Sequence, residues 1–460
     1  MNLTEQILEI MIPMQIAFSQ ARSFKKFIEV IFAILCTAGR HTITSFIFFL
    51  QGEHKDWTHM YRFFSKQKWD PDVCFDVLAE SALRKVLQKH NDIVIALDDF
   101  RVEKTGKTIP HTRYQLDPKS PSFHPNLMWG HRYAHATLLI ARKKKGKWQA
   151  ARSITVRIKL APHVRKPGKK ATEKDWEAYE ASKKDHNLCQ YAADIIRELR
   201  QLFDRLGYER KTIKLVADGG YCNKTIFGNL PDRVDLITRC RKDAKLCHRS
   251  SQKRKFYDDV KFTPHDLYKD EAVGSRKLEI FYGRKRTWLK YKEWPLVYWE
   301  RGAKKRPLKA MVVYGVRYRR NRNGYTNYRE PMYLLTTDLT LKTQTLIQYY
   351  LFRWEIEVAH RQLKNDLGIS QAQVWNERSV ERCPKLIALA NSIIHLAEIL
   401  LKEEDDKAYQ SKPNWDKGRH RISLEYLRRR LRQEIADNPA LSPFFDCEMS
   451  WQSIFTRVAA

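Results

Sequence analysis

Residues 93–99 read IVIALDD, a run of five apolar side chains that ends in two acids. An uninterrupted apolar run of this length predicts a strand that is buried on both faces, as in a sheet covered by helices on both sides. The prediction places the carboxylates of Asp98 and Asp99 at the end of that strand. Two later runs, Ala134–Ala141 and Ile154–Leu160, are also strand-like.

A helix and two further strands follow these three. Leu188–Leu206 carries apolar residues on one face at helical spacing, and Gly207 lies just past its end. Strand-like Ile213–Ala217 stops at Asp218, and Val234–Thr238 completes the series after a short helical piece. Three consecutive strands predict an antiparallel meander, and the later alternation predicts parallel crossovers. This is the element order of the RNase H-like fold, so we expect an α/β protein with a mixed-sheet catalytic core.

The sequence on either side of this core has a different pattern and predicts further domains. The chain's length of 460 residues predicts several domains. We expect a helical N-terminal domain (1–90), the first part of the core (91–240), a β-strand-rich insertion with a hairpin turn at 320–324 (241–338), the second part of the core with the catalytic helix (339–370), and a helical C-terminal region (371–460). For residues 1–90, DNA binding and a purely structural role are both open.

The chain carries a large excess of positive charge. Lys and Arg number 85 against 53 Asp and Glu, which gives a formal charge of +32. Such an excess repels itself unless a polyanion neutralises it, and nucleic acid is the usual partner. An RNA-binding protein or a soluble basic enzyme would have the same balance. A basic stripe near the C-terminus could bind DNA and comprises Arg428, Arg429, Arg430 and Arg432.

The compartment follows from what the sequence lacks. Its eight cysteines form no CxxC pair, which argues for free thiols in a reducing cytosol rather than a zinc site. The N-terminus lacks the basic region of a secretory signal. The longest apolar run, Leu386–Leu401, is shorter than the roughly 20 residues that span a membrane, so it predicts a buried core helix. We expect a soluble, cytoplasmic protein with no membrane partner.

The acids at the strand ends indicate phosphodiester chemistry. Two divalent metal ions about 3.5–4 Å apart can activate water and stabilise the leaving oxygen of such a bond. Mg²⁺ prefers carboxylate oxygens, so three acids that converge from separate elements suffice. Asp98 or Asp99 would supply the first and Asp218 the second, because their strands are neighbours in this fold. The third acid should come from a helix after the sheet.

A long helix, expected over roughly 342–367, offers that acid. Tyr350, Arg353, Glu357 and Lys364 are three, four and seven residues apart. At about 100° per residue they share a stripe about 60° wide. One helix face thus presents an acid that can hold metal beside cations that can hold phosphates. A charged stripe of this kind is otherwise typical of a solvated helix face.

These residues resemble a known family. The segment YLFRWEIEVAHRQLK, residues 350–364, is similar to the Tyr-x2-Arg-x3-Glu-x6-Lys (YREK) signature of bacterial insertion-sequence transposases in the DDE superfamily. ALDDFRVEKTGK (96–107) and VADGGYCNK (216–224) resemble the regions around that family's first and second aspartates. The resemblance covers roughly residues 20 to 400.

The resemblance implies a role for each matching residue. Asp99, Asp218 and Glu357 would be catalytic and would bind two Mg²⁺ ions, for which Mn²⁺ can substitute. Tyr350, Arg353 and Lys364 would contact DNA. The family commonly has Thr after the first aspartate, where this chain has Phe100, so Asp98 stays an alternative to the favoured Asp99.

The resemblance also implies a reaction and partners. A DNA transposase would cleave double-stranded DNA at the terminal inverted repeats of its element and join the ends to target DNA, as a homodimer that pairs two ends. An RNase H-like endonuclease without strand transfer, or an inactive DNA-binding regulator, are the alternatives.

Some relatives hold a flipped base on an aromatic residue of the insertion, but Trp288, Trp294 and Trp299 are better explained as core residues. His131 and His135 are expected to be structural, and His360 is expected to pack or to lie on the phosphate side.

Overall fold

A computed structural model gives the fold. It describes residues 1–50, 56–87, 92–117, 120–121, 123–141, 143–144, 146–162, 166–282, 285–319, 325–404 and 422–438. The hairpin turn expected at 320–324 lies outside the described residues.

Five strands form the centre of the structure and confirm the α/β RNase H-like fold. They are β1 (Ile93–Glu103), β3 (Leu127–Ile140), β6 (Arg152–Leu160), β7 (Ile213–Ala217) and β8 (Val234–Arg239). They lie in the order β6-β3-β1-β7-β8. The β1–β3 and β3–β6 pairs are antiparallel, whereas β1–β7 and β7–β8 are parallel, as the meander and the crossovers predict. Short β2 (Arg113–Leu116) also pairs with β3, and β4 (Lys143–Lys144) and β5 (Lys147–Trp148) form a small hairpin.

Strand β1 is longer than predicted, and this changes the setting of its acids. The prediction ended the strand at Asp98 and Asp99, but both lie inside β1. The reason is that the two neighbours of β1 stop at different points. Pairing with β7 ends at Leu97 opposite Ala217, while pairing with β3 continues to Glu103. The acids therefore lie at a step in the sheet, where one side of β1 becomes free.

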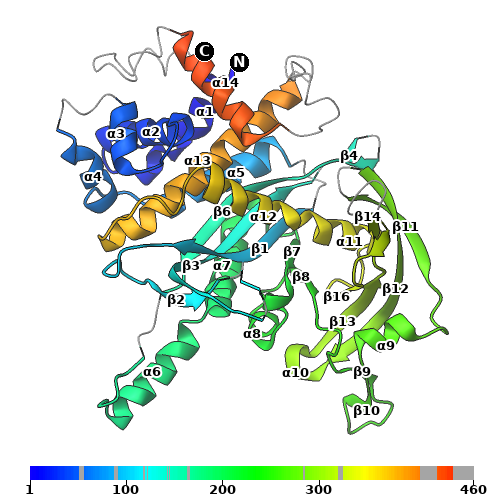
Figure 1. Cartoon of the computed structure of the whole chain (residues 1–460). Coiled ribbons are helices and arrows are strands. Elements are labelled where there is room, and N and C mark those ends of the chain that lie inside the picture. The colour runs from blue at the N-terminus through cyan, green and yellow to red at the C-terminus, as the bar shows by residue number, and fades with distance from the viewer. Residues whose placement is uncertain are drawn as a thin grey trace.

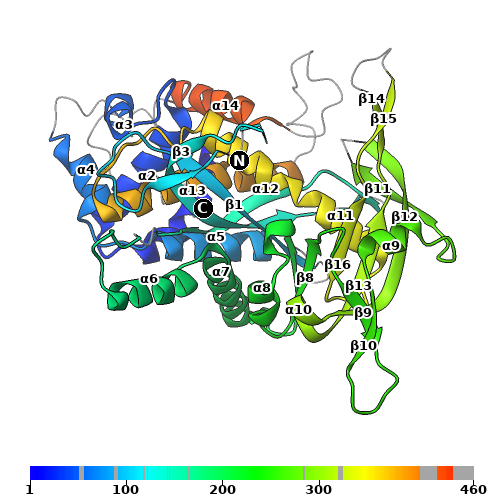
Figure 2. The same ribbon diagram turned by 60° about the horizontal axis from the view of Figure 1, so that its bottom comes forward.

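Most strands of residues 241–338 extend the central sheet instead of forming a separate one, and among the described strands of this region only β14 and β15 pair apart from it as a small two-stranded sheet. Beyond β8 the same sheet continues in the order β16-β13-β12-β9-β10, and β11 pairs with β12. Figure 2 shows these strands grouped at the end of the molecule away from the N-terminal helices. The longest of these strands, β12, shifts its register against β13 twice, between Trp294 and Val297 and between Val297 and Trp299. The bounds of this region are β9 (Leu246–Arg249), β10 (Tyr257–Phe262), α9 (Pro264–Lys269), β11 (Arg276–Tyr282), β12 (Lys285–Trp299), α10 (Glu300–Ala303), β13 (Lys304–Val313), β14 (Arg317–Arg319), β15 (Thr326–Tyr328) and β16 (Met332–Thr336).

Helices cover both faces of the central sheet (Figure 1). One face is covered by α7 (Leu188–Phe203), which continues into the turn η2 (Asp204–Tyr208) and ends at the predicted Gly207, whose φ is +87°. Near it lie η3 (Gly219–Tyr221) and α8 (Lys224–Gly228). The other face is covered by α11 (Thr343–Phe352), α12 (Trp354–Arg361), η4 (Gln362–Asp366) and α13 (Glu377–Glu404). The exposed α6 (Glu173–Asp185) projects from the body, as the polar composition of that stretch predicts.

The N-terminal helices pack on α13 and share one hydrophobic core with the sheet. In helix α13 every residue of the predicted apolar run Leu386–Leu401 is buried. The helix is long and apolar enough to cross a membrane by length and composition alone, but its most apolar 18-residue window is buried inside the protein. The helices that pack on it are α1 (Leu3–Met11), α2 (Ala21–Cys36), α4 (Thr58–Ser65), α5 (Pro71–Lys85) and α14 (Leu424–Ala436), whereas η1 (Ile12–Ala17) packs on α1 and α5, and α3 (Ile43–Phe49) packs on α2 and α4.

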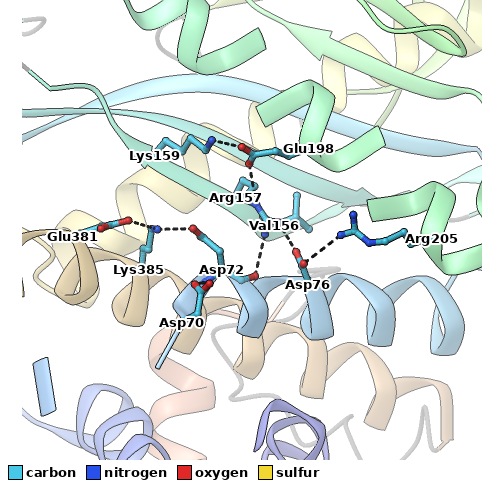
Figure 3. A network of polar contacts seen from close by, with 10 residues as sticks. All are labelled: Asp70, Asp72, Asp76, Val156, Arg157, Lys159, Glu198, Arg205, Glu381 and Lys385. Carbon is cyan, nitrogen blue, oxygen red and sulfur yellow. Dashed lines mark hydrogen bonds and ion pairs between the residues drawn. The ribbon is translucent and has the colours of Figure 1, made fainter. Parts of the chain in front are cut away.

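A network of ion pairs ties α5 to the rest of the core (Figure 3). The guanidinium of Arg157, on β6, contacts the carboxylate of Asp76 and donates to the backbone oxygen of Asp72 at 3.2 Å. The Asp72 carboxylate accepts from Lys385 of α13 at 2.9 Å. Lys159 of β6 contacts Glu198 of α7. The network joins α5, β6, α7 and α13, and so anchors an N-terminal helix to the catalytic sheet.

The basic stripe on α14 is only partly exposed. Arg428, expected to face DNA, is buried and donates to the backbone oxygens of Leu35, Thr37 and Asp366. Its guanidinium therefore holds α14 against the loop after α2. Arg430 and Arg432 pair with Glu434 and Glu425. The stripe interpretation is wrong for Arg428, because an arginine can satisfy several buried carbonyls at a helix–helix contact.

A buried ion pair between β6 and α13 gives a stability prediction. Arg152 lies 2.6 Å from Glu398, and their side chains are 9% and 4% exposed. Glu398→Ala should lower the free energy of unfolding by about 3–5 kcal/mol, because it leaves a buried guanidinium without its anion. Urea denaturation measures this. The control Glu80→Ala breaks the exposed pair with Arg84 and should cost less than about 1 kcal/mol; equal effects of the two variants would contradict the prediction.

Candidate active site

The pleat of β1 separates its two acids. Val94 and Ala96 pack in a cluster with α11, whereas Ile95 and Leu97 face α7. Side chains alternate along a strand, so Asp98 lies on the α11–α12 face and Asp99 on the α7 face. Their partners agree with this: the Asp98 carboxylate is 3.6 Å from the guanidinium of Arg353, whereas Asp99 is 2.7 Å from Nε of Arg132 on β3.

Asp218 lies beside Asp98 at the edge of the sheet. It directly follows β7, and the residues before the two acids, Leu97 and Ala217, are register partners in the parallel β1–β7 pair. The side chain of Asp218 caps the next turn by accepting from the backbone N–H of Gly220 at 2.8 Å. Its backbone oxygen accepts from the hydroxyl of Thr238 on β8 at 2.8 Å. These bonds fix the acid at the end of β7.

The two acids are close enough to repel each other. Burial raises the pKa of Asp98 to about 7, and the negative charge of Asp218 contributes to this rise. The Asp98 side chain is only 14% exposed. A carboxylate in this setting favours a cation beside it.

Glu357 is joined to this pair through Arg353. The Arg353 guanidinium donates to Oε1 of Glu357 at 2.8 Å and approaches Asp98 from the other side. Glu357 lies in the first turn of α12, and its side chain is 32% exposed. Of the three expected catalytic acids, Glu357 and Asp218 therefore lie toward Asp98, while Asp99 points to the opposite face.

The predicted continuous helix over 342–367 is wrong in one respect, because it breaks at Arg353. Helix α11 ends at Phe352 and α12 begins at Trp354. Tyr350 is buried, and the Arg353 guanidinium lies 5.6 Å from the centre of its ring. Lys364 lies farther along, in η4, with its ammonium 5.8 Å from the ring centre of Phe100.

A cationic cleft opens next to the acids. It has a volume of about 640 Å³, and Asp218, Tyr350 and Arg353 form one part of its wall. Another part of its wall is basic and consists of Arg239, Arg241 and Lys242. Sequence reasoning missed these three. The segment Arg239-Cys-Arg-Lys242 is basic, but only the parallel pairing of β8 with β7 brings it beside Asp218.

The histidines and tryptophans mostly serve the core. His135 and His360 are buried and share a hydrogen bond of 2.9 Å. His131 is buried and contacts the backbone oxygen of Pro110 at 2.7 Å. Trp294 packs on Phe262, and Trp299 on Phe227, as expected for core residues. Trp288 differs, because it is 67% exposed on β12.

An RNase H-like sheet with acids at this edge and a cationic cleft beside them defines a class of enzymes that cut nucleic acids. Comparison with known families agrees: residues 17–257 match the family described as DDE superfamily endonuclease, and residues 175–389 match the family described as Transposase DDE domain. The first match spans more than half of the chain, so this chain belongs to the DDE superfamily of endonucleases. The second match contains both Asp218 and Glu357. No curated protein matches the chain.

The burial of Asp98 and its repulsion with Asp218 predict an unusual stability change. Folding raises the pKa of Asp98, so its ionisation at pH 8 costs folding free energy, a cost that disappears below the unfolded-state pKa of about 3.9. Asp98→Asn should therefore raise the free energy of unfolding at pH 8, by up to about 4 kcal/mol, and this gain should shrink as the pH falls toward 4. Urea denaturation in EDTA measures both.

Asp99→Asn is the matched control for this prediction. Asp99 is paired with Arg132, so its replacement should lower the free energy of unfolding at pH 8 by about 1–3 kcal/mol. The assignment of the two acids to opposite faces fails if the variants change stability in the same direction.

Proposed function

We propose that this protein is a DNA transposase that cleaves DNA at the ends of a transposable element and joins the freed 3′ ends to target DNA. The observation that supports this most is the arrangement of three acids beside a cationic cleft. Asp98 lies next to Asp218, and Arg353 pairs with both Asp98 and Glu357. Acids at such a point can hold divalent cations, and the cleft can hold the phosphates of the same substrate.

We assign the first metal ligand to Asp98 in place of Asp99. Asp98 shares a face of the sheet with Glu357, whereas the Asp99 carboxylate is held by Arg132 on the other face. Asp98, Asp218 and Glu357 would then bind two Mg²⁺ ions, and Mn²⁺ can substitute. Asp99 becomes a positioning residue, because its pairing with Arg132 fixes the end of β1 against β3.

The donor set fits this role. Three carboxylates come from three separate elements, as hard cations require. Asp98 lies beside Asp218, and its nearest paired cation is the Arg353 guanidinium. Among the described residues, no group of three His, Cys, Asp or Glu already stands at metal-binding separations. When bound, the ions would activate water and stabilise the leaving 3′ oxygen.

The side chains of the site would position the DNA. Arg353 can release its carboxylates and face a substrate phosphate, because its planar guanidinium suits both kinds of anion. The ring of Tyr350, whose centre is 5.6 Å from that guanidinium, would help to hold it in place. Arg239, Arg241 and Lys242 would hold the strand in the cleft, and Lys364 would contact a phosphate on the other side of Glu357. In-line attack by water, and then by the freed 3′-OH, needs no covalent enzyme intermediate.

The partners would be double-stranded DNA and a second copy of the chain. The N-terminal helices offer a surface for the terminal inverted repeats, since Trp57, Tyr61 and Arg62 are exposed on and next to α4. Pairing of two element ends requires two active sites, hence a homodimer. The enzyme would act in the cytoplasm, where DNA is accessible.

Replacement of the acids tests the active site. Asp98→Asn, Asp218→Asn and Glu357→Gln should each reduce cleavage of end DNA in Mg²⁺ by at least roughly 10²–10³-fold, the loss seen when one charge-stabilising group is removed. Asp99→Asn should reduce it less, by roughly 10–100-fold, as for a residue that acts through its neighbours. Gel assays of cleavage measure this. The exposed Glu377→Gln serves as control, and normal cleavage by Asp98→Asn would overturn the assignment.

Strand transfer needs a separate experiment. Labelled end DNA that already has its 3′-OH is incubated with plasmid, Mg²⁺ and the full-length protein. A transposase should produce covalently joined, slower-migrating DNA, and Glu357→Gln should not. Cleavage of intact ends without joining of pre-cleaved ends would instead identify an RNase H-like endonuclease.

A further inference from the structure

Three arginines form a row on the face of the sheet opposite α12. Arg101 on β1 is the direct register partner of Arg132 on β3. Arg113 on β2 is the partner of Gly130, which lies two residues from Arg132 and therefore on the same face. Asp99 also belongs to this face. Arg101, Arg113 and Arg132 thus lie side by side, immediately beyond one of the acids at the sheet edge.

This arrangement is unfavourable without an anion. Like charges directly opposite each other in a sheet repel. Burial and the charge of Arg132 lower the pKa values of both Arg101 and Arg113. The carboxylates near the row are Asp99, which is bonded to Arg132, Asp117, whose charge partly offsets the effect at Arg101, and the exposed Glu103, which shares this face of β1.

Two of the three guanidiniums have no bonding partner within the described part of the chain. Arg132 donates to Asp99, but Arg101 and Arg113 make no hydrogen bond or ion pair with a described residue, and Nε of Arg101 is buried without an acceptor. The buried arginines Arg382 and Arg428 differ from these half-buried side chains. Arg382 and Arg428 each donate to several backbone carbonyls. The row is therefore not an ordinary structural use of arginine in this protein.

The row lies close to the reaction centre. The charges of Arg132, Asp99 and Asp218 all act on the thiol of Cys189, in the first turn of α7, which places these groups around one point. The N-terminal end of that 16-residue helix adds positive potential there.

We propose that Arg101, Arg113 and Arg132 bind a backbone phosphate of the substrate DNA on the α7 side of the sheet edge. The proposal rests on the proposed function for its ligand. Guanidinium groups bind phosphate oxygens through paired hydrogen bonds, and one phosphate can neutralise neighbouring arginines. The DNA would then be bound on both sides of the acids, by the cleft on the α11–α12 face and by the three arginines on the α7 face.

The test compares two double variants that lose the same charge. Arg101→Gln/Arg113→Gln removes the unpartnered members of the row but keeps Arg132, which holds Asp99. Arg84→Gln/Arg197→Gln removes two arginines from exposed ion pairs on α5 and α7. Binding of fluorescent end DNA is measured by anisotropy in EDTA over a range of salt concentrations. The row variant should bind about tenfold more weakly and should reduce the slope of log K against log salt by about one, unlike the control.

Substitution of single phosphates by neutral methylphosphonates locates the contact. At one phosphate position the methylphosphonate should weaken DNA binding by the wild-type protein. The same substitution should not weaken DNA binding by the row variant any further. Equal salt slopes for the two double variants, or the absence of such a phosphate position, would overturn the proposal. So would a result in which inorganic phosphate stabilises only the wild-type protein while the row variant binds DNA as tightly as the wild type does.

Thermal unfolding without DNA separates binding from a structural role. Because the arginines repel each other, Arg101→Gln should leave the Tm unchanged or raise it. A lower Tm together with an unchanged salt slope would show that Arg101 serves stability and would overturn the proposal. None of these measurements uses cleavage, so a failure of the row leaves the assignment of Asp98, Asp218 and Glu357 to be judged by its own assay.

Discussion

Two carboxylates held side by side where the parallel pairing of β1 with β7 ends are the constraint around which this structure is arranged. Asp98 and Asp218 are brought together because β1 and β7 are paired in parallel up to the residues just before them. The repulsion between them is tolerated because cations surround the site: Arg353 between Asp98 and Glu357, and the basic wall of the cleft beyond Asp218. The site thus concentrates negative charge inside a protein whose formal charge is +32.

The core of the fold was predictable because its signals are local. Apolar runs of strand length and one amphipathic helix give the order of elements, and the rules for crossovers give the sheet. The strand Ile213–Ala217 was predicted to the residue, and Gly207 ends its helix as expected. These features depend on neighbours in sequence, and the sequence records them directly.

What could not be predicted depends on partners distant in the chain. The extension of β1 past Asp98 is imposed by β3, and the choice between Asp98 and Asp99 depends on which face of that strand meets α12. The break at Arg353 and the joining of residues 241–338 to the main sheet likewise arise from tertiary contacts. Arg239, Arg241 and Lys242 were missed because a basic run becomes meaningful only when its strand is known to end beside an acid.

The position of α13 has a consequence for how the chain reaches its native state. Helices α1 and α2 bury their apolar faces against α13, and the backbone N–H and the hydroxyl of Thr4 donate to the carboxylate of Glu434 on α14 at 2.9 and 3.0 Å. Helices α1 and α2 therefore cannot complete their packing until some four hundred further residues, as far as α14, have been synthesised. Until then the apolar surface of both helices is not fully covered, and a chain that stopped before α13 would expose it. Synthesis through α14 is in this sense a condition for a folded N-terminal region.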